Sequence, residues 1–224
     1  MTYCFLDTSV FVNPKFLGSE KIQRFFALAE EGYLWILIPK VTYREVQKKA
    51  HEVIKKELAS MQKASKFLIA NTKSYRSNIK DISEVDALNE FDSLFEQLTS
   101  GVNVTILDYP QNSTETIFNS YFNEKPPFSS SKKSEFPDAF AIYSLEEWAA
   151  KKSVKVNLLS HDRDITNYQS TNLIANQSPE DFLDHINKEI ERSHSNGRRL
   201  EIVEQLFRNN TQLIEEHVRK WFRY

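Results

Sequence analysis

Short apolar segments of strand length alternate with longer segments of helical periodicity over the first 175 residues, and this alternation is the strongest constraint on the fold. The segments, which are mostly apolar, are residues 3–6, 33–38, 102–107, 154–159 and 173–175. Strands that are apolar throughout are buried on both faces of a sheet, and helices between successive strands provide the crossovers that parallel strands need. The sequence therefore predicts an α/β fold, with a central parallel sheet between two layers of helices.

Two helical additions extend this α/β unit. Apolar residues at helical spacing from Thr42 onward, and again from Ser83 to Leu98, predict a helical hairpin inserted at about residues 42–98. Ser83 and Asp86 have the spacing of a helix N-terminal cap. Residues 178–224 are expected to be mostly helical, so we predict a domain of residues 1–177 followed by a helical C-terminal extension.

Cysteine usage and hydropathy exclude several classes of protein. The single cysteine, Cys4, excludes an intramolecular disulfide framework, and no Cys or His cluster has the spacing of zinc ligands. No segment approaches the roughly 18 consecutive apolar residues of a membrane span. We therefore expect a soluble protein of the reducing cytoplasm that has no membrane partner.

Charge is unevenly distributed, although the formal net charge is only −2. Residues 40–80 contain eleven Lys or Arg and three Glu. Such a basic helix is either a solvated face or a surface that contacts RNA, and both interpretations stay open. The three tryptophans, Trp35, Trp148 and Trp221, are expected to lie in the core and not to stack on bases.

Four carboxylates that are far apart in the sequence occur next to ends of the predicted strands. Asp7 follows the first strand, Glu45 lies in the helix after the second, Asp138 starts the helix before the fourth, and Asp162 follows the fourth. A parallel sheet brings such positions to one edge, so we expect the four side chains to converge within coordination reach. Like charges repel unless a cation neutralises them, and oxygen ligands suit Mg²⁺ or Mn²⁺.

Each acid also has a structural alternative. Glu45 follows Thr42 by three residues, which is the spacing of a capping box. Asp138 lies in the first turn of a predicted helix, where a carboxylate interacts favourably with the helix dipole. Asp162 and Asp164 follow a strand, and aspartates in such turns often accept hydrogen bonds from the backbone.

The four motifs around these acids, taken in order, resemble those of the PIN-domain ribonucleases over roughly residues 3–175. The motifs are FLDTSV at 5–10, VTYREV at 41–46, PDA at 137–139 and LSHDRD at 159–164. The segment KKSEFPDA, residues 132–139, particularly resembles a bacterial PIN-like subgroup that is larger than the toxin-type members. The resemblance implies a three-layer α/β/α domain that uses Mg²⁺ or Mn²⁺ to cleave single-stranded or structured RNA, with its acidic positions at Asp7, Glu45, Asp138 and Asp162.

The implied chemistry is metal-assisted hydrolysis, in which the carboxylates hold one or two ions that activate water. Asp164 is expected to orient Asp162 without binding the ion itself. Candidate contacts to the substrate are Ser9 (or Thr8), Arg44, Lys48, Lys132, Lys133 and Arg163. An ordinary loop hydroxyl or a solvated charge is the alternative for each. RNA is the expected partner, a homodimer is left open, and nothing in the sequence indicates an antitoxin.

Two rival functions are considered. A phosphatase of the haloacid-dehalogenase type also has an acidic loop after its first strand, but it generally needs a second Asp two positions after the first, where this chain has Ser9. A non-catalytic PIN-like scaffold, whose helical additions bind other proteins, is the other rival. The helical hairpin and the C-terminal extension are absent from a minimal PIN toxin. They therefore argue against a toxin role more than against the nuclease chemistry.

Overall fold

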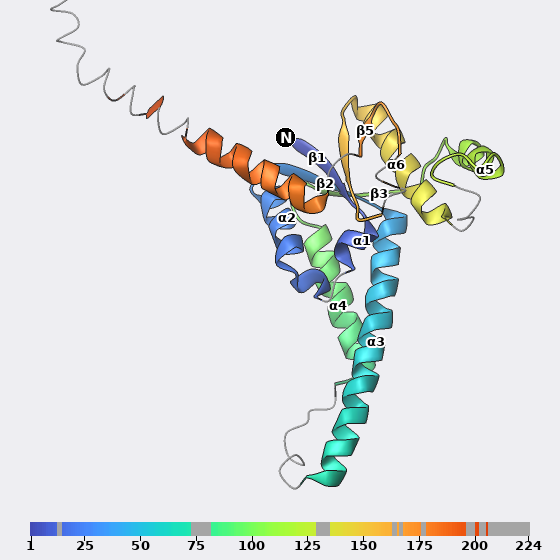
Figure 1. Ribbon diagram of the computed structural model, residues 1–224, viewed down its shortest axis with the longest axis vertical. Coiled ribbons are helices and arrows are strands. Elements are labelled where there is room, and N and C mark those ends of the chain that lie inside the picture. The colour runs from blue at the N-terminus through green and yellow to red at the C-terminus, as the bar shows by residue number, and fades with distance from the viewer. Residues whose placement is uncertain are drawn as a thin grey trace, which may run out of the picture. The chain divides into compact units, whose positions relative to one another are not determined.

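A computed structural model describes residues 1–12, 15–72, 82–128, 135–162, 165, 168–175, 178–195, 200–201 and 205. The chain divides into two compact units, Met1–Pro179 and Glu180–Tyr224. The first unit contains the sheet and the helices that cover it (Figure 1).

The sheet has five parallel strands, which confirms the predicted α/β class. The strands are β1 (Thr2–Leu6), β2 (Leu34–Pro39), β3 (Val104–Leu107), β4 (Val156–Leu159) and β5 (Leu173–Ile174). Their spatial order is β3-β2-β1-β4-β5, so β1 is central and lies beside both β2 and β4. In the β1–β4 register Leu6 is opposite Leu159, so the residues that follow these two strands leave the sheet together.

Helices cover both faces of the sheet, which confirms the three-layer α/β/α architecture. The helices of this unit are α1 (Thr8–Phe11), η1 (Phe16–Gly18), α2 (Glu20–Glu30), α3 (Lys40–Asn71), α4 (Glu84–Thr99), α5 (Thr114–Phe122) and α6 (Phe136–Lys152). On one face, Phe5 and Leu158 share a buried apolar cluster with Leu145 of α6. Successive strand residues point to opposite faces, and α2 contacts β2 from the other side. As expected, Trp35 and Trp148 pack against this core, with their rings 6.0 and 5.4 Å from that of Tyr3.

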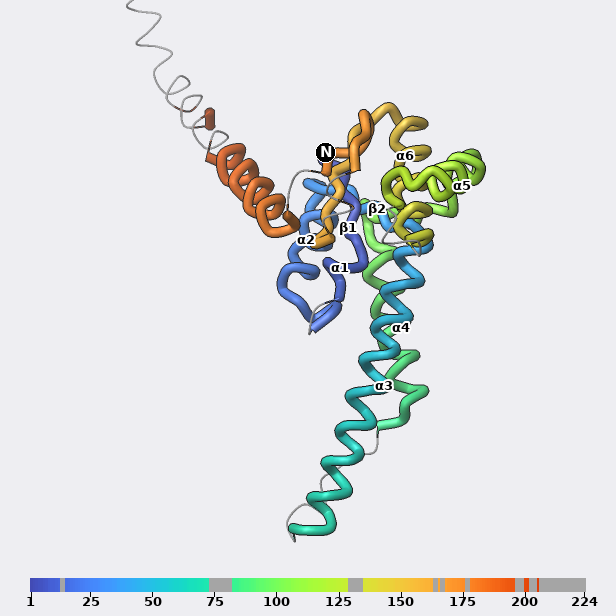
Figure 2. Tube along the Cα trace, turned by 45° about the vertical axis from the view of Figure 1, so that its right-hand side comes forward, coloured from blue at the N-terminus to red at the C-terminus, as the bar shows by residue number. Residues whose placement is uncertain are grey.

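The predicted helical hairpin consists of α3 and α4, which lie side by side where they approach the sheet (Figures 1 and 2). Tyr43 of α3 stacks on Phe95 of α4 at 4.6 Å between ring centroids, and Phe95 is fully buried. The N-cap of α4 is Ser83, whose side chain accepts a hydrogen bond from the Asp86 N–H as the spacing predicts. Helix α3 has 32 residues and is therefore about 48 Å long.

In the C-terminal extension, which is expected to be mostly helical, residues 179–195 form a helix. Most of the chain after residue 195, including Trp221, lies outside the described residues. A search of the described helices finds none with the length and apolar character needed to cross a lipid bilayer. Cys4 is a buried free thiol in β1, and burial raises its pKa.

Candidate functional site

Asp7 is held rigidly at the carboxyl end of β1. Its N–H donates to the carbonyl of Leu159 at 3.0 Å, and its side chain caps α1. The carboxylate oxygen Oδ2 accepts hydrogen bonds from the Ser9 N–H (3.1 Å), the Ser9 hydroxyl (2.6 Å) and the Ser160 hydroxyl (2.8 Å). Asp7 is only 6% exposed. Capping α1 requires only the hydrogen bond from the Ser9 N–H to this carboxylate. The two additional bonds from the Ser9 and Ser160 hydroxyls fix the orientation of the carboxylate more closely than capping requires.

Ser160 connects the end of β4 to the end of β1, and the sequence assigned it no role. Its hydroxyl donates to Asp7 and accepts from the Asp162 N–H at 2.9 Å, and the residue is 3% exposed. The Ser9 hydroxyl lies 3.2 Å from that of Ser160 and accepts from the His161 N–H at 3.0 Å. The sequence does show that Ser160 is a hydroxyl residue directly after a buried strand. It does not show that Asp7 accepts the hydrogen bond, because that depends on which strand lies next to β4.

Glu45 is joined to the same loop by Thr8, whose hydroxyl donates to Glu45 Oε2 at 3.0 Å. The capping-box interpretation of Glu45 is wrong. Helix α3 begins at Lys40, its N-cap is Pro39, and no side chain caps it. Thr42 is therefore already inside the helix, and Glu45 lies half-buried in the second turn. Hydrogen bonds thus link the segments that carry Glu45, Asp7 and Asp162.

Asp138 lies in the first turn of α6, the position from which a carboxylate can interact with the helix dipole. Its pKa is raised from 3.8 to about 7, first by burial and then by the negative charges of Asp7, Glu45, Glu135 and Asp162. Three of these four neighbours are the other acids that the sequence singled out. Glu135, directly before α6, is an additional carboxylate that sequence reasoning missed, although its place three residues before Asp138 was visible.

The acids do not form a ready-made metal site. Among the described residues, no three Asp, Glu, His or Cys side chains are close enough together to hold one ion. The expected convergence within coordination reach is therefore not found in that part of the chain. The chemistry of the donors still fits Mg²⁺ or Mn²⁺, because these ions prefer carboxylate oxygens of high negative charge density. One of the four, Asp138, has a pKa of about 7 and can therefore gain or lose a proton near neutral pH.

The basic residues predicted to contact the substrate do not share a hollow with the four acids in the part of the chain that the structure describes. Arg44 and Lys48 line a hollow of about 420 Å³ between α3 and α4, together with Gln47, His51 and Asp92, and none of the four acids lines it. The Asp92 carboxylate accepts from Gln47 at 3.1 Å and lies 2.9 Å from His51 Nε2. Four further predicted residues lie outside the described residues: Lys132, Lys133, Arg163 and Asp164.

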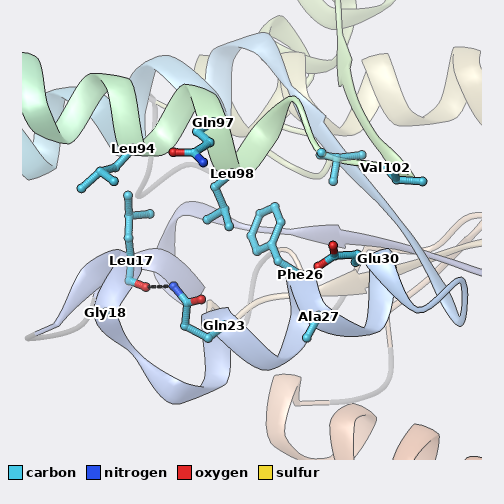
Figure 3. Close-up of a pocket in the computed structure, with 12 residues that line it drawn as sticks. Leu17, Gly18, Gln23, Phe26, Ala27, Glu30, Leu94, Gln97, Leu98 and Val102 are labelled. Carbon is cyan, nitrogen blue, oxygen red and sulfur yellow. Dashed lines mark hydrogen bonds between the residues drawn. The ribbon is translucent and has the colours of Figure 1, made fainter.

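A larger cavity of about 660 Å³ lies between α2 and α4 (Figure 3). Leu17, Phe26 and Leu98 are among its lining residues, and the Gln23 amide donates to the Leu17 carbonyl at 2.6 Å. Its lining is mostly apolar and contains none of the four acids. The acidic site is therefore a feature of the sheet edge and not of this cavity.

The raised pKa of Asp138 predicts that stability depends on pH when no metal is added. Asp138 binds its proton more tightly in the folded chain (pKa about 7) than in the unfolded chain (near 3.8), so raising the pH from about 4 to 7 destabilises the fold. After allowance for solvent screening, we expect a loss of about 1–2 kcal/mol, or a few degrees in Tm. The measurement is Tm against pH, in a chelator, for the wild type and Asp138→Asn.

The variant should lose this part of the pH dependence, so the two curves should diverge progressively between about pH 4 and 7 and stay apart at higher pH. Asp108→Asn is the control, because Asp108 is an exposed acid at the end of β3 that pairs with Lys40 at 3.1 Å. Parallel curves for the wild type and Asp138→Asn would show that Asp138 is not crowded by its neighbours.

A comparison with protein families gives one match: a model described as a PIN domain covers residues 4–165. The matched region runs from β1 past β4 and includes all four acids. Neither the curated proteins nor the solved structures yielded a match to this chain.

Proposed function

The chain belongs to the PIN-domain family, which consists generally of nucleases that use divalent metal ions, and from this membership we propose that it is a metal-dependent endoribonuclease. The proposed catalytic and metal-binding residues are Asp7, Glu45, Asp138 and Asp162. The observation that carries this assignment is the hydrogen-bond linkage at the sheet edge. Thr8 joins the first loop to Glu45, and Ser160 joins it to Asp162.

In this proposal the four carboxylates hold one or two Mg²⁺ or Mn²⁺ ions. Asp164 does not bind the ion directly and orients Asp162. When bound, such an ion lowers the pKa of water and neutralises charge on the phosphate. The chain's own residues supply orientation: Ser9 and Ser160 hold the Asp7 carboxylate, and Thr8 holds that of Glu45. Asp138 loses its proton when a cation replaces it among the neighbouring charges.

Metal binding should be measurable without any substrate. Adding Mn²⁺ to metal-free protein at pH 8 should raise Tm by several degrees at saturation, because an ion that binds only the folded state stabilises it by mass action. The shift should shrink at pH 6, where protons compete for the carboxylates. Thermal unfolding over a Mn²⁺ titration measures both effects.

Asp7→Asn should reduce this Mn²⁺-dependent shift strongly, while Asp108→Asn should keep it. An equal shift in both variants would mean that Mn²⁺ binds elsewhere, and the proposed ligand set would then be wrong.

The proposed substrate is RNA, single-stranded or structured. Candidate contacts remain Ser9, Arg44, Lys48, Lys132, Lys133 and Arg163. Arg44 and Lys48 are exposed near Glu45 on α3, which is consistent with a phosphate contact, whereas the Ser9 hydroxyl is engaged with Asp7 and Ser160. The direct test is endonucleolytic degradation of end-labelled RNA by pure protein with Mn²⁺, compared with the same reaction in a chelator.

A binding role without catalysis is the second candidate. It is favoured by large apolar side chains exposed on the hairpin, namely Val53, Met61, Phe67, Ile69 and Val85. Exposed apolar surface of this kind often marks a protein interface. Turnover of RNA separates the two roles, since a scaffold would bind metal or a partner without cutting RNA. Membership of the PIN family leaves no support for the phosphatase alternative.

The wider organisation completes the proposal. Residues 1–177 form the nuclease domain and residues 178–224 the helical extension. We keep the cytoplasm as the proposed location, in keeping with the single buried thiol of Cys4. A homodimer stays open, and size-exclusion chromatography with light scattering tests it.

A further inference from the structure

Helix α5 (Thr114–Phe122) exposes aromatic rings on its surface. Phe118 is 44% exposed and Phe122 is 73% exposed. Their rings face each other one helical turn apart, with centroids 6.5 Å apart and planes tilted by 29°. Isolated exposed apolar residues need no explanation, but a contiguous aromatic surface does. We call the set Phe118, Tyr121, Phe122, Phe128 and Phe136 the aromatic platform.

The exposed rings of the aromatic platform pack on its less exposed members. Phe136, at the start of α6, lies 5.7 Å from Phe118, 4.9 Å from Tyr121 and 5.0 Å from Phe128 between ring centroids. Phe128 is buried in a cluster with Ile117 and Ala139. A hydrogen-bond contact of 3.1 Å between the Ser120 and Tyr143 hydroxyls also joins α5 to α6. The exposed rings are therefore held in place by packing, as a recognition surface requires.

The aromatic platform adjoins the acidic site through the first turn of α6. Phe136 contacts Phe118 of α5, and Asp138 follows two residues later. Because an α-helix turns by about 100° per residue, Phe136 and Asp138 lie on roughly opposite flanks of this turn, one helix diameter apart. Figures 1 and 2 both show α5 beside the beginning of α6. A strand that crosses this end of α6 would pass from the carboxylates to the rings.

We propose that the aromatic platform stacks an unpaired base of the nucleic-acid strand, a few nucleotides from the bond that is cut. The proposal rests on the nuclease function proposed above and names a second contact for its substrate. Flat aromatic faces accept any base, and each stacked base strengthens binding substantially.

The place of this surface favours a nucleic acid over a protein partner. Its rings pack against Phe136 at the start of α6, and Asp138, one of the carboxylates proposed to hold the metal ion, lies in the same helical turn. A strand bound at the carboxylates would therefore have the rings within reach, and flat aromatic faces stack on the bases of single strands.

The test compares Phe122→Ala with two matched variants of the full chain. Phe67→Ala removes a ring of similar exposure (66% against 73%) from α3, and Phe122→Trp keeps an aromatic face. All three are made together with Asp7→Asn to prevent cleavage, in Mn²⁺. The probe is a single-stranded RNA in which 2-aminopurine replaces one base at successive positions, because its fluorescence is quenched on stacking. Circular dichroism confirms that each variant is folded.

We expect Phe122→Ala to weaken RNA binding about tenfold and to remove the quenching at one or two positions. Phe67→Ala and Phe122→Trp should retain both signals. The salt dependence of binding should not change, since no phosphate contact is lost. Unchanged affinity and quenching in Phe122→Ala would overturn the proposal, and a simultaneous change in oligomeric state would identify a protein interface instead. RNA that binds and quenches but is never cut by the wild type would overturn the proposed catalysis and leave the aromatic platform intact.

Discussion

Asp7→Asn and Asp138→Asn should each lower Mn²⁺-dependent RNA cleavage by roughly a thousandfold or more. A catalytic metal contributes several kcal/mol to a phosphodiester transition state, and each 1.4 kcal/mol is a factor of ten in rate. The fold should survive both changes. At position 7 the amide oxygen of Asn can accept the hydrogen bonds from Ser9 and Ser160 that Oδ2 now accepts. Removing one crowded negative charge should leave Tm unchanged or raise it slightly.

Measuring activity and unfolding on the same preparations tests this prediction. Asp108→Asn is the matched control, since it makes the same chemical change after another strand of the sheet. Asp108 is exposed and pairs with Lys40, so its loss should leave cleavage within about twofold. If Asp7→Asn or Asp138→Asn lost Tm as severely as activity, these acids would be structural caps, and the nuclease proposal would lose its catalytic residues.

Charge reversal of four lysines on α3 should weaken RNA binding by about a hundredfold at low salt. Lys48, Lys49, Lys55 and Lys56 are exposed and follow Glu45 on the same helix, so they extend positive potential away from the proposed site. Each lost phosphate contact should flatten the slope of log K against log salt concentration by roughly 0.7 for a single strand. Titrations of the four Lys→Glu changes at several salt concentrations measure both quantities.

The structure divides these lysines into two pairs that can be tested separately. Lys48 and Lys55 line the hollow beside Asp92, and Lys55 also pairs with Glu84 at 3.5 Å. Lys49 and Lys56 do not line it, and they lie about 100° further around the helix from Lys48 and Lys55. If RNA follows the hollow, charge reversal of Lys48 and Lys55 should cause most of the loss in RNA affinity. Equal losses from the two pairs would indicate that the lysines attract RNA through their summed electrostatic potential and not through contacts in the hollow.

Two outcomes limit this second prediction. Lys155→Glu is the control, because Lys155 directly precedes β4 and therefore lies at the other edge of the sheet from Asp162. Cleavage at saturating RNA should persist in all the lysine variants, since none holds the metal. If binding and its salt slope were unaltered, the lysines would be a solvated face, and the hairpin would be better explained as a surface for a protein partner or a second copy.

The strands could be predicted because each is a short, largely apolar run, and the three inner strands β1, β2 and β4 are mostly buried. The edge strands β3 and β5 are less buried, with Ile106 43% and Ile174 37% exposed. The strand sequences also predicted that the residues after β1 and β4 would lie at one edge. The start of α3 was missed by two residues, because Pro39 ends β2 and serves as the N-cap without a side-chain hydrogen bond. Residue propensities at Lys40 and Val41 do not reveal this, whereas the polar cap of α4 at Ser83 is local and was visible.

The finer parts of the site depend on contacts between distant segments. The bond from Ser160 to Asp7 exists because β4 lies next to β1 with Leu159 opposite Leu6, and local sequence does not specify that register. Helical spacing likewise shows that one face of α5 is apolar, but not whether another element covers it. For this reason the exposure of Phe118 and Phe122 could not be predicted from the sequence.

The hydroxyl partners of Asp7 and Glu45 have a consequence for which ion these residues would accept. In each carboxylate one oxygen already takes its bonds from Ser9 and Ser160, or from Thr8. Within the described residues no hydrogen bond reaches the other oxygen of either group. If these two residues hold the proposed metal ion, each would offer it one carboxylate oxygen. Ligands of this kind suit the strict octahedral shell of Mg²⁺, whereas Ca²⁺ takes more oxygens and binds carboxylates through one or both. Thr8, Ser9 and Ser160 would therefore favour the smaller ion without touching it.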